Sequence, residues 1–206
     1  MAGKVGFSLL LLMNLVIHMA TTAQSSITRH PDPNPSNFIK SSCRSTRYPV
    51  LCVQSLLGYA TLIRRSDRQL AMTALSVSIS KTRSSASFVR KMSKGRGMKH
   101  RQYIAVQDCI ENIADSVDRL KQSVRELGRT REAAGDDFTW HVNNVQTWVS
   151  AALTDDNTCL DGFSGSGMNG KVKGAIMDRV VHVAQVTSNA LALVNRFASR
   201  HRTTSP

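Results

Sequence analysis

A row of apolar residues that recurs every three or four positions between residues 103 and 127 is the feature that most constrains the fold of this chain. The row consists of Tyr103, Val106, Ile110, Ile113, Val117, Leu120, Val124 and Leu127. This spacing places every member on one face of an α-helix, which has about 3.6 residues per turn. Gly128 is the expected C-terminal cap, because glycine readily adopts the backbone conformation that ends many helices. The segment is therefore predicted to be a long amphipathic helix.

Three further segments repeat this spacing, and each is predicted to be an amphipathic helix. Their apolar rows are Met72, Leu75, Ile79, Thr82, Ala86 and Val89; Phe138, Val142, Val145, Val149 and Ala152; and Ile176, Val180, Val183, Thr187, Ala190, Val194 and Phe197. Asp136 or Asp137 is the expected N-terminal cap of the second of these helices. No proline lies between Pro49 and Pro206, so the sequence contains no strong helix breaker across this region.

Four amphipathic helices with one apolar row each can bury those rows only against one another. The predicted fold class is therefore all-α, with an up-down-up-down four-helix bundle. A coiled-coil dimer is the alternative for such spacing, but the rows are short and separated by loops. Short helical pieces from about residue 43 to residue 57 are expected to form an appendage before the bundle.

The first 23 residues have the three parts of a secretory signal peptide. Lys4 provides the basic start, residues 7–16 form a short apolar core, and residues 21–23 form a small-residue exit. A membrane anchor is the alternative, but the apolar stretch is shorter than the roughly 20 residues that span a bilayer. We expect a signal peptide at 1–23, a flexible leader at 24–37, a bundle domain at 38–199 and a tail at 200–206. The mature chain is expected to be secreted and to leave the membrane after cleavage.

The chain has four cysteines, Cys43, Cys52, Cys109 and Cys159. An even number of cysteines in an oxidising compartment favours two disulfides, and four cysteines allow three pairings. A zinc site is the alternative, but the sequence has no Cys-x-x-Cys and no histidine at ligand spacing. We therefore expect two disulfides, no bound metal and no cofactor.

The charge of the chain is strongly positive, with 27 basic and 14 acidic residues and a formal net charge of +13. Such a protein is attracted to anionic surfaces, among them acidic wall polysaccharide and nucleic acid. No nucleic-acid-binding motif is present, so no nucleic-acid partner is expected. A basic run is a candidate contact for an anionic polysaccharide, or else a solvated linker. It comprises Lys91, Lys94, Arg96, Lys99, His100 and Arg101.

Several local motifs occur in register with the cysteines. They are Ser42–Cys43 followed after eight residues by Cys52, Asp108–Asn112 continuing to Asp118–Leu120, Thr147–Thr154, and Thr158–Phe163. With these motifs, the chain resembles the plant invertase and pectin methylesterase inhibitor family from about Ile39 to Phe197. The resemblance implies a four-helix bundle with an N-terminal helical hairpin. It also implies disulfides that pair Cys43 with Cys52 and Cys109 with Cys159.

The resemblance implies an inhibitor rather than an enzyme, and no Gly-x-Ser-x-Gly, His-Glu-x-x-His or phosphate-loop motif is present. Invertase inhibitors of this family carry Pro-Lys-Phe after the fourth cysteine, whereas this chain has Ser164–Gly170 there. The predicted function is therefore inhibition of pectin methylesterase by a 1:1 non-covalent complex that blocks the substrate cleft. Inhibition of invertase is one alternative, and a basic pectin-binding wall protein without inhibitory activity is the other. The expected location is the extracellular space, in the apoplast or cell wall, where anionic pectin is a second expected partner.

The helix at 103–127 is predicted to carry an acidic row opposite its apolar row. This row is Asp108, Glu111, Asp115 and Asp118. A solvated outer face is the plain interpretation, because like charges at these spacings destabilise a helix slightly. The family resemblance implies instead that Glu111, Asp115, Asp118, Thr158 and Asp161 contact the target enzyme.

Overall fold

The computed structural model describes residues 34–95, 97–164 and 170–204, and it describes the side chains as far as residue 201. The helices are α2 (Pro35–Cys43), α3 (Pro49–Leu56), the short 3₁₀ helix η1 (Leu57–Tyr59), α4 (Ala60–Ile63), α5 (Asp67–Met92), α6 (His100–Arg129), α7 (Gly135–Asp161) and α8 (Lys171–Thr204). This part of the chain contains no strand, and the all-α prediction is confirmed. The predicted signal peptide and most of the predicted leader lie outside the described residues.

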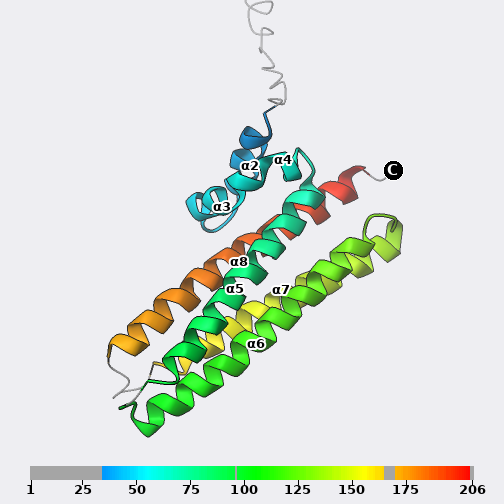
Figure 1. Cartoon of the computed structure of the whole chain (residues 1–206). Helices are drawn as coiled ribbons and strands as arrows, with labels where there is room; N and C mark the ends of the chain where they lie inside the picture. The colour runs from blue at the N-terminus through cyan, green and yellow to red at the C-terminus, as the bar shows by residue number, and fades with distance from the viewer. Residues whose placement is uncertain (1–33, 96, 165–169, 205–206) are drawn as a thin grey trace, which may run out of the picture. The chain divides into compact units, whose positions relative to one another are not determined.

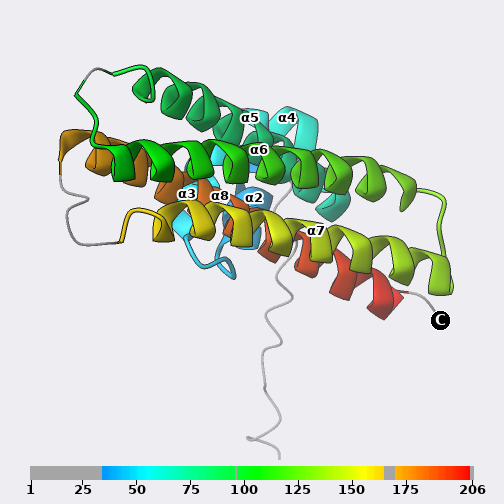
Figure 2. The ribbon, with the colours of Figure 1, turned by 90° about the horizontal axis from the view of Figure 1, so that it is seen from below.

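The four long helices α5 to α8 form the bundle (Figures 1 and 2). Each packs against the next along the chain, and α8 returns to pack against α5, which closes the ring. Consecutive helices run in opposite directions, so the up-down-up-down arrangement is the observed one. None of the described helices is both long enough and apolar enough to cross a membrane.

The predicted apolar rows form the core of the bundle. Most members of the α6 row are buried, and Leu120 and Leu127 are fully so. Ile110 and Val124 are half-buried, and Tyr103, in the first turn of α6, is 46% exposed. Burying one side chain of the size of leucine or isoleucine contributes roughly 1.5–3 kcal/mol. These rows therefore account for much of the free energy that holds the four helices together.

The end of α6 differs from the prediction. Gly128 lies inside the helix, and Thr130 is the capping residue. Thr130 Oγ1 donates to the carbonyl of Leu127 at 2.8 Å, and the Arg68 guanidinium of α5 donates to the carbonyls of Leu127 and Gly128 at 3.2 and 2.8 Å. These side chains satisfy carbonyls that helix ends leave without a partner, so the left-handed glycine cap is not needed.

Three other helix ends also differ from the prediction. The cap of α7 is Ala134, and Asp136 and Asp137 lie in the first turn, where carboxylates favour the positive end of the helix dipole. Helix α2 begins at Pro35, inside the predicted leader, because the Asn34 side chain accepts from Ser36 N at 2.9 Å and proline suits a first helical position. At the other end, α8 continues to Thr204, through most of the predicted tail.

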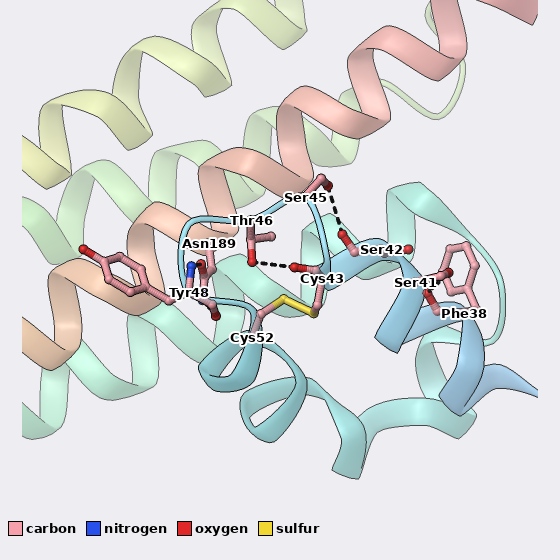
Figure 3. Close-up of a disulfide and its surroundings, with 9 residues drawn as sticks. All are labelled: Phe38, Ser41, Ser42, Cys43, Ser45, Thr46, Tyr48, Cys52 and Asn189. Atoms are coloured by element: carbon pink, nitrogen blue, oxygen red, sulfur yellow. Dashed lines mark hydrogen bonds between the residues drawn. A yellow bond between two sulfur atoms is a disulfide. The ribbon is translucent and has the colours of Figure 1, made fainter.

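The hairpin of α2 and α3 is held by the Cys43–Cys52 disulfide, which confirms the first pairing (Figure 3). Thr46 Oγ1 donates to the Cys43 carbonyl at 2.8 Å and stabilises the turn between the two helices. The Asn189 side chain of α8 accepts from Tyr48 N at 3.0 Å and donates to the Tyr48 carbonyl at 2.9 Å. This two-point contact attaches the hairpin to the bundle.

Candidate functional site

The Cys109–Cys159 disulfide joins α6 to the last turns of α7, and it confirms the second pairing. The two Cα atoms lie 4.2 Å apart although 50 residues separate the cysteines in sequence. Both cysteines are buried in a core cluster that also contains Ile113, Phe163 and Ile176. The disulfide therefore fixes the C-terminal end of α7, with Thr158 and Asp161, beside the half of α6 that carries the acidic residues.

Four acidic residues of α6 form a continuous exposed surface, which we name the acidic face. Its members are Asp108, Glu111, Asp115 and Asp118. They point away from the bundle because the opposite side of α6 carries the buried row. This confirms the arrangement expected from their spacing of three, four and three residues.

The charges of the acidic face are neutralised unevenly. Lys121 Nζ donates to Asp118 Oδ1 at 2.7 Å. This hydrogen bond and the charge of Lys121 lower the pKa of Asp118, with smaller contributions from Arg125 and Arg83. In the described part of the chain, no salt bridge engages Glu111 or Asp115. These two carboxylates, like that of Asp108, are consequently open to a cationic partner.

Arg119, the other cation that follows the acidic face, is engaged by α7. Its Nε donates to Asp155 Oδ2 at 2.7 Å, and Asp155 is mostly buried. Burial raises the pKa of Asp155, the hydrogen bond and charge of Arg119 offset part of this rise, and the Asp115 carboxylate adds to it. The ion pair stiffens the junction of α6 and α7 directly beside the acidic face.

Thr158 and Asp161 are both exposed on the last two turns of α7. Thr158 Oγ1 donates to the Thr154 carbonyl at 2.9 Å, which leaves its oxygen lone pairs to accept a hydrogen bond from a partner. The Asp161 carbonyl accepts from Ser164 Oγ at 2.7 Å, a contact that ends the helix and holds the residue in place. Both residues therefore lie exposed on α7 next to Cys159, which the disulfide joins to the half of α6 that carries the acidic face.

Asp156 lies beneath this surface, and the sequence analysis missed it. It is fully buried, and neither of its carboxylate oxygens forms a hydrogen bond in the described structure; Ser116 Oγ, buried on α6, forms none either. The pKa of Asp156 is raised to about 7, because burial and, to a smaller extent, the charge of Asp155 raise it by more than the Ser116 hydroxyl, which lies outside hydrogen-bond geometry, lowers it. A signal was present, because Asp156 and Cys159 continue the three-and-four spacing of Val149 and Ala152.

The distribution of charge between the helices sets α6 and α7 apart. Together they carry ten of the 14 acidic residues, and α7 contains neither lysine nor arginine. The chain as a whole has a formal net charge of +13. The α6–α7 surface is thus locally acidic on a basic protein, and it presents carboxylates on two helices that a disulfide and an ion pair hold in place. Such a surface is suited to recognition of a cationic patch on another protein.

Comparisons with known proteins agree with this architecture. The family model described as plant invertase/pectin methylesterase inhibitor matches residues 37–193. A protein of Arabidopsis thaliana named pectinesterase inhibitor 9 is 53% identical over 196 residues, which cover 93% of this chain and 96% of that protein. The "21 kDa protein" of Daucus carota is 51% identical over 169 residues, which cover 82% of this chain and 88% of that protein.

The fold is also similar to a solved structure. The crystal structure of a mutant form of a pectin methylesterase inhibitor from Arabidopsis has a TM-score of 0.61 and 18% identity, and the match covers 76% of this chain and 95% of that one. At this identity the likeness concerns the fold, and the family assignment depends on the sequence matches. The chain belongs to the plant invertase/pectin methylesterase inhibitor family.

Proposed function

We propose that this protein is a non-catalytic inhibitor of pectin methylesterase. The observation that carries the proposal is the similarity over almost the whole chain to a protein named as a pectinesterase inhibitor, at 53% identity. The protein forms a 1:1 non-covalent complex with the esterase and covers its substrate cleft, so that the polysaccharide cannot enter. The contact residues are Glu111, Asp115, Asp118, Thr158 and Asp161, on the α6–α7 surface.

The rigidity of this surface supports the proposal. A preformed patch on two helices loses less conformational entropy on docking than a mobile loop does. The Cys109–Cys159 disulfide and the Arg119–Asp155 ion pair both hold α7 against α6 at this place. The open carboxylates of Glu111 and Asp115 suit a basic patch on the esterase. Because exposed charges are screened over about 10 Å at 0.1 M salt, binding should weaken as salt is added.

The proposed site of action is outside the cell. The segment 1–23 acts as a secretory signal peptide, and the mature protein reaches the apoplast and the cell wall. The two disulfides are of the kind that persists in an oxidising extracellular compartment. The net positive charge draws the protein to anionic pectin, which keeps it close to its target enzyme.

Invertase is not the favoured target. The chain lacks the Pro-Lys-Phe segment that the family's invertase inhibitors carry after the fourth cysteine, because no proline occurs between Pro49 and Pro206. The residues that replace this segment, 165–169, lie outside the described structure. A relative that this chain matches over 93% of its length is also named for pectinesterase and not for invertase.

Titration of two purified target enzymes tests the proposal. The mature protein is added in steps to a plant pectin methylesterase and, separately, to a cell-wall invertase. We expect esterase activity to fall linearly to an end point at one inhibitor per enzyme, and invertase activity to stay unchanged. Inhibition of invertase alone would reverse the assignment of the target. Inhibition of neither enzyme would leave a pectin-binding wall protein as the function.

A further inference from the structure

A second surface of unusual charge lies at the other end of the bundle. It is a hollow of about 600 Å³ between the turn that joins α4 to α5, the turn after α6, and the last turns of α8. Three arginines and one histidine line it, and its described lining contains no carboxylate. The arginines are Arg64, Arg68 and Arg131, and the histidine is His201. Along α6, about 30 Å separates the end of the helix from Cys109, because each residue adds about 1.5 Å.

Arg68 is the lining residue whose side chain is held in place by hydrogen bonds. Its guanidinium donates to the carbonyls of Leu127 and Gly128, which holds it against the end of α6. Its Nε is buried and forms no hydrogen bond in the described structure. Burial lowers the pKa of Arg68, and the positive charge of Arg131 lowers it further. The fold therefore keeps two guanidinium groups close enough to repel each other.

Arg64 is held at the edge of the hollow by an unusual backbone conformation. It follows α4 with φ of 54° and ψ of −110°, and it is the one non-glycine residue with positive φ in the described structure. A residue with a β-carbon adopts this region only when its surroundings impose it, and such residues concentrate at functional sites. This conformation places a third arginine, which is exposed, in the lining of the same hollow.

The acidic residues that are close in sequence to these arginines do not neutralise their charge. Asp67 forms ion pairs with Arg196 at 2.9 Å and with Arg200 at 3.2 Å, so its charge is already balanced. Glu132 follows Arg131 but does not line the hollow. The hollow consequently retains an excess of positive charge that a bound anion would offset.

We propose that this hollow binds a chain of carboxylated sugars, namely an oligomer of galacturonate. Guanidinium groups bind planar carboxylates through two parallel hydrogen bonds, and several arginines in one hollow suit a ligand with several separate carboxylates. The hydroxyl of Thr61 and the amide of Gln69 also line the hollow and can bind sugar hydroxyls. The volume falls within the roughly 300–1,000 Å³ that is usual for ligand sites.

The choice of galacturonate rests on the proposed function. A pectin methylesterase hydrolyses methyl-esterified galacturonate to the free carboxylate and methanol, so the ligand is the product of the enzyme that this protein would inhibit. Along α6, Thr130 at the hollow lies about 18 Å beyond Asp118 of the acidic face. The two sites therefore do not overlap, and one molecule can hold the de-esterified polymer and the enzyme together.

Calorimetric titration of the mature protein with de-esterified oligogalacturonate tests this inference. The site variant is Arg64→Gln/Arg131→Gln, and Arg68 is kept because it caps α6. The matched control is Lys81→Gln/Arg90→Gln, which removes the same charge from two exposed residues of α5 that lie outside the hollow and outside the basic run. We expect the site variant to bind at least about tenfold more weakly and the control to change by less than about twofold, since loss of charged hydrogen bonds has effects of this size.

Two further ligands make the result specific. The fully methyl-esterified oligomer should not bind, and inorganic phosphate should not compete at equal concentration. Equal losses in the two double variants would overturn the inference, because they would indicate attraction by net charge alone. Competition by phosphate would show that the hollow binds anions in general, and the proposal of a site for a sugar chain would be wrong. If the double variant does not fold, the single change Arg131→Gln in the exposed turn gives the same comparison.

The inference and the proposed function fail in distinguishable ways. The site variant should inhibit pectin methylesterase as well as the unmodified protein does. Loss of oligogalacturonate binding with full inhibition is therefore the expected pair of results. If the unmodified protein binds no oligomer but inhibits the esterase, the inference is wrong and the proposed function stands.

Discussion

Arg119 Nε and Asp155 Oδ2 lie 2.7 Å apart across the junction of α6 and α7. Arg119 lies four residues after Asp115 on the same helix. Because Asp155 engages Arg119, this cation is less available to neutralise Asp115. Lys121 in turn is engaged by Asp118. The acidic face is therefore graded, with open carboxylates at Asp108, Glu111 and Asp115 and a balanced one at Asp118.

The first prediction follows from this gradation. Asp115→Lys/Asp118→Lys should weaken inhibition of pectin methylesterase by at least about a hundredfold, because like charges facing each other across an interface cost several kcal/mol. Of the two single variants, Asp115→Lys should have the larger effect, since Asp118 is already neutralised by Lys121. Inhibition constants give the effect, and circular dichroism checks the fold.

The matched control for this prediction is Glu132→Lys/Asp178→Lys. These residues are also exposed, and neither forms a salt bridge within the described structure. The control therefore makes the same change in net charge as the Asp115/Asp118 variant, but outside the acidic face. The control should inhibit normally. Full inhibition by the folded Asp115/Asp118 variant would place the docking surface elsewhere on the bundle.

The second prediction concerns the two disulfides. On the chain-entropy model, closing the 50-residue span of Cys109–Cys159 contributes about 4 kcal/mol to the free energy of unfolding, and closing the 9-residue span of Cys43–Cys52 contributes about 2.5 kcal/mol. Cys109→Ser/Cys159→Ser should therefore lower the melting temperature more than Cys43→Ser/Cys52→Ser does. Calorimetric melting of both variants gives the comparison. The opposite order would mean that native-state contacts around the hairpin outweigh the effect of loop length.

The third prediction is a dependence of stability on pH that arises from Asp156. Its pKa in the folded protein is about 7, above the 3.8 of an unperturbed carboxyl. At a pH between these two values, Asp156 is therefore protonated in the folded state and ionised in the unfolded state. The contribution of Asp156 to the free energy of unfolding therefore falls by about 1.4 kcal/mol per pH unit as pH rises across this window. Asp156→Asn removes the effect.

Urea unfolding of the two proteins from pH 4 to pH 8 measures the effect of Asp156. The stability of Asp156→Asn relative to the unmodified protein should rise across this range and level off above pH 7, by at most about 4 kcal/mol. The control is Asp178→Asn, which removes an exposed carboxylate instead of a buried one. A parallel curve for Asp156→Asn would mean that Asp156 ionises normally in the fold.

The fourth prediction concerns Glu126, the buried acid near the end of α6. Its carboxylate accepts hydrogen bonds from Asn144 and Arg129 and lies 2.8 Å from His141 Nδ1. Burial opposes its ionisation, but the hydrogen bonds from His141 and Asn144 outweigh this and lower the pKa of Glu126. Glu126→Ala should reduce the free energy of unfolding by roughly 3 kcal/mol, because it leaves buried partners without an acceptor.

Inhibition should be unaffected by Glu126→Ala at temperatures where the variant is folded, since Glu126 lies outside the acidic face. Esterase inhibition measured beside urea unfolding separates the two effects. A large loss of inhibition in a folded variant would show that the docking surface extends to the end of α6.

The apolar rows were sufficient to predict the bundle, because the need to bury one face of each helix leaves few arrangements. Carboxylates within the buried surface were not predicted. Glu126 and Asp156 both occupy inward-facing positions, but a carboxylate in such a row is usually assigned to solvent. Only the facing helix shows whether a partner such as His141 is present.

The helix ends were the least predictable part of the fold. At the end of α6, Gly128 matched a local rule for helix ends, but the observed cap depends on Arg68, 60 residues earlier in the chain. Similarly, the exposure of Glu111 and Asp115 followed from their spacing, whereas the engagement of Arg119 by Asp155 depended on the packing of α7. The exposure of a side chain on its own helix could be predicted, whereas individual side-chain contacts between two helices could not.

The contact between Tyr48 and Asn189 has a consequence for the order of folding. It joins residues 141 positions apart, and forming it before the intervening helices are in place would close a very long flexible loop. The packed bundle brings Asn189 to the position where the hairpin can reach it. We therefore expect α5 to α8 to assemble first and the hairpin to attach last, as a small unit that its own disulfide keeps intact. In native-state hydrogen exchange, the amides of α2 and α3 should open at lower free energy than those at the centre of α6.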